Sequence, residues 1–177
     1  MKKKTLALVL ALTLLVAGVV GGTLAWLTDR TAEVKNTFTV GDINIGLTET
    51  TADYKMVPGN TIAKDPTVTV KANSEACWLF VKVTESTDLK DFITYAIAEG
   101  WTALPDVNGV YYREVPASAA DQTFPVLAGN AVTVKDTVTK ALLETAKTSA
   151  PTLTFKAYAV QKDNVTSASD AWAKVNP

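Results

Sequence analysis

The chain contains no histidine, and this absence excludes several kinds of catalytic site. Neither a Ser-His-Asp triad nor a Cys-His pair can be assembled without an imidazole. The zinc-binding pattern His-Glu-x-x-His is missing for the same reason, and no glycine-rich phosphate-binding loop is present. We therefore predict that the protein is not an enzyme and that it has no catalytic residue, metal site or cofactor.

Cysteine is almost absent as well. Cys77 is the only one, so an intramolecular disulfide is impossible and stability has to come from packing or from a partner. It lies in the apolar run Ala76–Val81, which is typical of a buried strand. A thiol in such a run is expected to be buried and inert rather than reactive.

The chain also lacks a marked excess of charge of either sign. It has 17 basic and 18 acidic residues, a net charge of -1. That balance favours neither nucleic acid nor an anionic membrane surface as a partner. No pair of acidic residues stands out as the two carboxylates of a glycosidase.

The most informative stretch that is present lies at the N-terminus. Lys2–Lys4 precede an uncharged run from Thr5 to Thr28, and the small residues Thr23 and Ala25 stand near its end. This is the three-part layout of a secretory signal peptide, with the small residues at positions -3 and -1 of the cleavage site. We predict a signal peptide over residues 1–25, a mature protein that begins at Trp26, and secretion, with membrane contact only as the precursor.

An uncleaved membrane anchor is the alternative. Leu6–Leu27 is long enough, because about 20 apolar residues span a bilayer. The crowding of glycines at Gly18, Gly21 and Gly22, next to a ready cleavage site, favours removal over anchoring.

Short β-rich runs separated by turn residues make up the rest of the chain. This pattern predicts an all-β, two-sheet jelly roll or β-sandwich with one or two short helices, in a single domain over 26–177. The clearest runs are 36–48, with a β-bulge expected at Gly41-Asp42, and 67–71, 76–84, 93–98, 110–115, 123–127, 131–138 and 153–160. Helices are expected over Thr139–Lys147 and after Ser167, which is placed to cap the second one.

Two features outside the core pattern suggest interaction surfaces. The segment 26–40 alternates apolar and polar residues from Thr28 onward, so it predicts a strand that adds either to its own sheet or to the sheet edge of a neighbour. Trp101, Tyr111 and Tyr112 flank one predicted hairpin around Asn108-Gly109, and they are candidates for a binding surface or for the core. Because Tyr111 and Tyr112 are adjacent, their side chains must lie on opposite faces.

The junction Gly21–Asp29 resembles that of exported proteins of the TasA/camelysin type, which are processed by a dedicated SipW-like signal peptidase. Further similarities follow in order along the chain, at Asn36–Phe38, Gly41–Ile45, Val57–Asn60, Leu79–Val83, Phe155–Gln161 and Ser169–Trp172. The resemblance implies a jelly roll, export from a Gram-positive bacterium and, for the best-known relatives, assembly into biofilm-matrix fibres. This chain is shorter than the fibre-forming prototype and lacks its long insertions.

These observations lead to three hypotheses about function. The first is a secreted structural protein of the extracellular or biofilm matrix, which associates with itself or with a matrix protein by strand addition. The second is an extracellular module that binds wall or matrix carbohydrate or protein through Trp101, Tyr111 and Tyr112. The third is a protease, because camelysin-type proteins have been called metalloproteases, and the absence of histidine argues against it.

Overall fold

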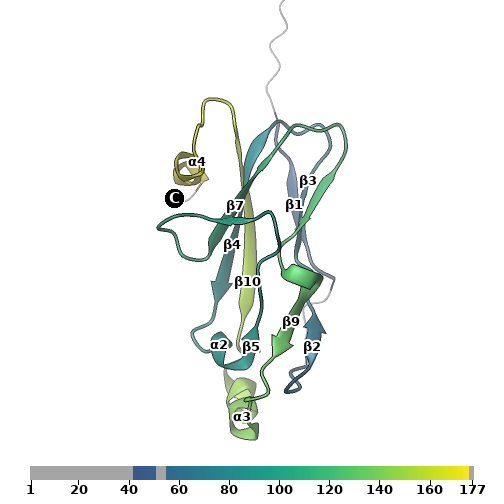
Figure 1. Cartoon of the computed structure of the whole chain (residues 1–177), viewed down its shortest axis with the longest axis vertical. Helices are drawn as coiled ribbons and strands as arrows, with labels where there is room; N and C mark the ends of the chain where they lie inside the picture. The colour runs from purple at the N-terminus through teal and green to yellow at the C-terminus, as the bar shows by residue number, and fades with distance from the viewer. Residues whose placement is uncertain (1–41, 51–54, 176–177) are drawn as a thin grey trace, which may run out of the picture. The chain divides into compact units, whose positions relative to one another are not determined.

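The computed structural model describes residues 42–50 and 55–175, which lie within the compact unit Val40–Pro177. The described chain forms a β-sandwich of antiparallel strands with short helices, which confirms the predicted fold class. One layer is a four-stranded sheet (Figure 1), and its order is β10 (Leu153–Gln161), β4 (Cys77–Glu85), β7 (Val110–Val115) and β6 (Thr102–Ala103).

Strand β4 lies at the centre of this sheet because it is apolar on both faces. Leu79 and Val81 are completely buried on the face between the layers, and Trp78 and Phe80 are buried on the opposite face. The nine-residue register with β10 pairs Cys77 with Gln161 at one end and continues without interruption to the other. The sequence pattern predicted such a central strand over 76–84, and the structure confirms it.

The second layer consists of two three-stranded sheets placed end to end (Figure 1). One has the order β1 (Ile45–Thr48), β3 (Thr67–Val70) and β8 (Gln122–Pro125), and the other has the order β2 (Thr61–Ala63), β9 (Ala131–Val134) and β5 (Ile93–Thr94). Two backbone bonds bridge the break between them, from Lys64 N to Asn130 O (2.8 Å) and from Val126 N to Pro66 O (2.9 Å).

The break in the second layer has a local cause. Pro66 has no N–H with which to continue a ladder, and Gly129 and Asn130, in the short 3-10 helix between β8 and β9, have φ angles of 62° and 50°. Two strands of this layer are shorter than the sequence predicted. The run expected over 131–138 ends at Val134, and the run expected over 93–98 forms only β5 and an isolated bridge at Ile97.

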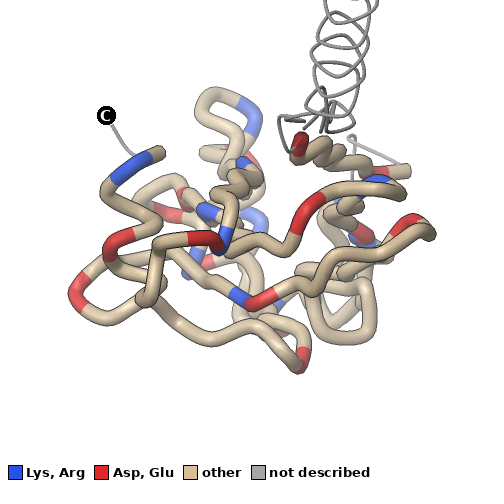
Figure 2. The backbone as a smooth tube through the Cα atoms, turned by 90° about the horizontal axis from the view of Figure 1, so that it is seen from above, with Lys and Arg blue, Asp and Glu red and all other residues tan. Residues whose placement is uncertain are grey.

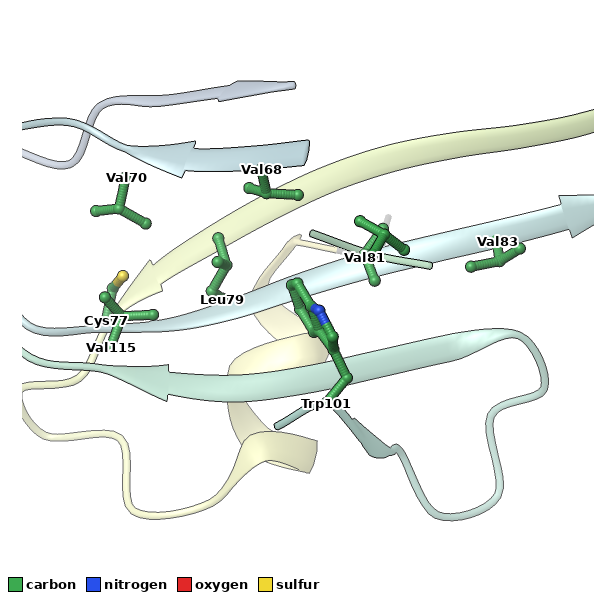
Figure 3. Close-up of a cluster of buried hydrophobic side chains, with 9 residues drawn as sticks. Val68, Val70, Cys77, Leu79, Val81, Val83, Trp101 and Val115 are labelled. Carbon is green, nitrogen blue, oxygen red and sulfur yellow. The ribbon is translucent and has the colours of Figure 1, made fainter. Parts of the chain in front are cut away.

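The main core lies between the two layers (Figure 3). It contains nine buried residues contributed by both layers, namely Val68, Val70, Cys77, Leu79, Val81, Val83, Trp101, Val115 and Val126. Alternation along β3 produces this arrangement, because Val68 and Val70 face inward while Thr67 and Thr69 do not.

Three α-helices complete the described part of the fold. Helix α4 (Ala168–Val175) covers the outer face of β4, where Trp172 packs on Phe80 with the ring centroids 5.3 Å apart. Ser167 caps it as predicted, since its hydroxyl accepts a bond from Asp170 N at 3.1 Å. Helix α3 (Lys140–Thr148) forms where it was expected, and α2 (Leu89–Phe92) is a single turn between β4 and β5.

The hairpin predicted around Asn108-Gly109 forms between β6 and β7, but its connection runs from residue 104 to residue 109. Gly109 is required there for a reason that the turn signal did not reveal. Its φ is 72°, and a Cβ at this position would lie 2.5 Å from the carbonyl oxygen of Val83. The close approach allows Val83 N to donate to Gly109 O at 2.7 Å.

Candidate functional site

The residues predicted to direct export, Thr23, Ala25 and Trp26, lie outside the described part of the chain. The expected bulge at Gly41-Asp42 and the alternating segment 26–40 also fall wholly or partly outside it. Within residues 42–50 and 55–175, no helix is both long enough and apolar enough to cross a bilayer.

Trp101, the first of the candidate binding residues, lies in the core between the layers. Only 9% of the residue is exposed, and its indole Nε1 donates to the carbonyl oxygen of Pro125 at 2.9 Å. Figure 3 shows the ring directed toward Val81. A buried tryptophan whose N–H has a partner is a structural anchor rather than an exposed stacking surface.

Tyr111 and Tyr112 lie on opposite faces of β7, as their adjacency requires. Tyr111 is half-buried against the core between the layers. Tyr112 is half-buried on the outer face, where its ring centroid lies 5.9 Å from that of Trp78 and 6.3 Å from that of Phe80. The structure therefore does not bring the three rings onto one surface.

The sequence reasoning did not single out Arg113, which lies beside this hairpin. Its guanidinium carbon is 4.0 Å from the ring centroid of Phe124 and 5.5 Å from that of Trp101. Burial lowers the pKa of the guanidinium, and its Nε has no hydrogen-bond partner. The strand alternation that faces Val115 inward also faces Arg113 inward, so this signal was available in the sequence.

The described residues offer little for nucleophilic or metal chemistry. No group of three or more histidine, cysteine or acidic side chains in this part of the chain is placed to hold a metal ion. Cys77 is completely buried, and burial raises its pKa to about 11. The thiol is therefore protonated at neutral pH, which is the unreactive form.

The most distinctive feature of the sandwich is the outer edge of β10. Among the described residues, no strand pairs with this edge. The bonds from Lys162 N to Ala76 O (2.8 Å) and from Ser86 N to Thr152 O (2.9 Å) show that even-numbered residues bond to β4. Because antiparallel bonding alternates along a strand, the odd-numbered residues 153–161 direct their N–H and C=O groups away from β4.

The inner face of this edge is apolar and incompletely covered. Phe155, Ala157 and Ala159 pack against the core between the layers, but each remains half-buried. Their neighbours on β4, Leu79 and Val81, are 0% exposed. The sandwich thus leaves both unpaired backbone groups and partly exposed apolar side chains along one strand.

A second edge that no described strand pairs with lies next to the first. Strand β1 contacts β10 across the layers, and its Ile45 belongs to the same core cluster. Asn44 O accepts from Lys71 N at 2.8 Å, so the backbone groups of Ile45 and Leu47 are directed away from β3. Leu47 is 37% exposed.

An ion pair that includes a buried lysine lies close to these edges. Lys64, only 8% exposed, donates to Glu49 at 2.6 Å, and its ammonium lies 5.5 Å from the ring centroid of Phe155 on β10. A lysine buried to this degree needs such partners, because an unpaired buried charge is costly.

Charges of both signs are interspersed along the described backbone (Figure 2). The surface therefore does not point to a partner of one charge. Comparisons of the chain with protein-family models, with curated proteins and with solved structures found no match.

Proposed function

We propose that this chain is an exported structural protein of the extracellular matrix that associates with other subunits by strand addition. The observation that carries the proposal is the nine-residue edge of β10, whose outward backbone groups pair with no other described strand and whose apolar inner face is only partly covered. An unprotected edge of this length is unusual, because proteins normally shorten, charge or cover such edges.

The sequence supplies a matching strand. Residues 28–40 alternate apolar and polar side chains, and the predicted cleavage after Ala25 would free this segment from the membrane. Added to β10, it would pair with the outward groups of residues 153–161 and place apolar side chains over Phe155 and Ala157. Main-chain bonds supply affinity in this mode, and alternate side chains supply specificity.

The resemblance of Gly21–Asp29 to TasA/camelysin-type junctions supports the same proposal, because it implies export and association in a matrix. The proposal assigns no catalytic activity to the chain. Its partners are a SipW-like signal peptidase during export and a second subunit or matrix protein afterward.

The experiment compares a protein that begins at Trp26 with one that begins at Asn36. Light scattering and electron microscopy follow their assembly at increasing concentration in mild acid and in salt. We expect the longer protein to form oligomers or fibres and the shorter one to remain monomeric. The proposal fails if the protein that begins at Trp26 stays monomeric at high concentration.

A second candidate function, an extracellular module that binds carbohydrate, is favoured by a different observation. A hollow lined by polar and aromatic side chains lies at the end of the sandwich formed by α2, β5 and the C-terminal end of β4.

A further inference from the structure

The hollow has a volume of about 400 Å³, and it is built from segments that are distant in the sequence. Glu85 ends β4, Tyr111 lies on β7, Thr94 and Tyr95 lie at β5, and Lys135 follows β9. Small-molecule sites occupy roughly 300–1,000 Å³ and combine an apolar lining with a few placed polar groups. The hollow lies within this range of volume, and it combines apolar side chains with polar ones.

The carboxylate of Glu85 is held in place by Tyr95, whose hydroxyl donates to Glu85 Oε1. Burial and the neighbouring Glu85 raise the pKa of Tyr95, so the phenol remains a donor. Oε2 of Glu85 has no partner among the described residues, which leaves it available as an acceptor. Charge-assisted hydrogen bonds of this kind are about twice as strong as neutral ones.

The ammonium of Lys135 is held in place by the backbone. Its Nζ donates to the carbonyl oxygen of Lys90, and its own N–H donates to Phe92 O at 2.9 Å. An ammonium has three N–H donors, so two remain for a ligand. The hollow thus contains one oriented acceptor and one oriented donor, each positioned by a contact within the protein.

Apart from Lys90 and Thr94, the remaining lining is apolar or aromatic. Leu89 is 3% exposed, Ile93 and Ile97 are half-buried, and the ring of Tyr111 is half-buried as well. Such surfaces contact the C–H faces of a ligand, while Thr94 adds a hydroxyl that can donate or accept.

We propose that this hollow binds a saccharide unit of a neutral polysaccharide. A hydroxyl-rich ring needs acceptors and donors together with an apolar surface, and the hollow supplies all three. A wholly apolar ligand would leave the carboxylate of Glu85 and the ammonium of Lys135 unpaired, whereas the hydroxyl groups of a saccharide can donate to the carboxylate and accept from the ammonium. The site gives the carbohydrate-binding function a location away from Trp101, and it does not depend on strand addition.

The test uses the full chain in dodecylphosphocholine, because a sugar-based detergent would compete with the ligand. Cellotriose, maltotriose and triacetylchitotriose are added separately, and saturation-transfer NMR and titration calorimetry detect binding. We expect at least one probe to bind with a Kd in the range of about 0.1–5 mM, typical of a small site with few polar contacts. Failure of all three probes to bind at about 20 mM, which corresponds to a very weak interaction, would overturn the proposal.

Two matched variants locate the site. Glu85→Gln should weaken binding of that probe about tenfold or more, because it removes the charged acceptor and keeps the side-chain size. Glu114 is an exposed carboxylate on β7 that accepts from Lys162 and does not line the hollow. The Glu114→Gln protein should therefore bind the probe as the unmodified chain does. Equal binding by both variants would overturn the assignment. If Glu85→Gln does not fold, Thr94→Val provides the same comparison. Assembly of subunits is measured separately, so failure of one proposal does not decide the other.

Discussion

Trp101 and Pro125 connect the two layers of the sandwich, since the indole Nε1 donates to the proline carbonyl at 2.9 Å. Trp101 immediately precedes β6 in one layer, and Pro125 ends β8 in the other. The bond satisfies the only polar atom of a side chain that is otherwise enclosed by the core, and it ties the hairpin to β8.

We expect Trp101→Ala to lower the free energy of unfolding by about 3–5 kcal/mol, the usual cost of deleting a large buried aromatic side chain. Trp101→Phe should cost less, because it retains most of the apolar volume and loses the bond to Pro125. Urea denaturation monitored by circular dichroism measures both, and Thr102→Ala, at an exposed neighbouring position, is the control. An unchanged unfolding midpoint combined with lost carbohydrate binding would instead assign Trp101 to a binding surface.

Ala157→Pro should block subunit association and spare the fold. The N–H of this odd-numbered residue is directed away from β4, so a proline ring removes a donor from the free edge and leaves the ladder with β4 intact. We expect assembly, measured by light scattering, to fall at least about tenfold, as loss of a strand-pairing edge implies. Ala157→Ser, which keeps the N–H, is the control. Equal assembly by a well-folded Ala157→Pro protein would exclude β10 as the acceptor.

Cys77 should make stability depend on pH above the neutral range. Burial raises its pKa from 9.0 to about 11, so its contribution is complete below pH 9 and is lost as the pH rises through 11. The free energy of unfolding should therefore fall over this interval by on the order of 2–3 kcal/mol, since one pKa unit corresponds to about 1.4 kcal/mol.

The Cys77→Ala protein should lack the part of this fall in the free energy of unfolding that comes from the thiol. The difference between the two proteins therefore separates the titration of Cys77 from that of tyrosines and lysines over the same interval. Chemical denaturation at pH 8 and pH 11 provides the comparison. Identical pH dependence of the two proteins would contradict the assignment.

Ala25→Leu should abolish processing of the precursor. A signal peptidase accepts small side chains at positions -1 and -3, so bulk at Ala25 or at Thr23, as in Thr23→Phe, is expected to leave the uncut chain in membranes. Leu24→Val, at the position between them, should be processed normally. N-terminal sequencing of the secreted protein is expected to begin at Trp26. If the secreted protein instead began upstream of Thr23, this would contradict both the predicted cleavage site and the strand-addition proposal that depends on it.

Local features of the fold could be read from the sequence. The central position of β4 follows from an apolar run on both faces, and the alternation of β3 follows from Val68 and Val70. The cap at Ser167 is equally local, because a hydroxyl that bonds three residues ahead depends only on the adjacent backbone. The early ends of β5 at Thr94 and of β9 at Val134 were missed, because a strand ends where its pairing with a neighbour ends, and these two strands are far apart in the sequence.

The candidate site could be predicted only in part. Adjacency determined that Tyr111 and Tyr112 face opposite sides, but a two-residue period does not say which side another layer covers. The packing of the second layer against one side of this sheet placed Trp101 in the core and put the guanidinium of Arg113 against the ring of Phe124.

The sequence by itself determined that the chain is β-rich, that it cannot use histidine or an intramolecular disulfide, and where its capped helices begin, because composition, periodicity and caps act over a few residues. Only the tertiary structure decided that β10 has no second neighbour among the described strands and that Glu85, Tyr95 and Lys135 line one hollow. The physical reason is that strand order and the packing of layers depend on contacts between residues far apart in the chain, and no local pattern encodes which strand is left without a neighbour.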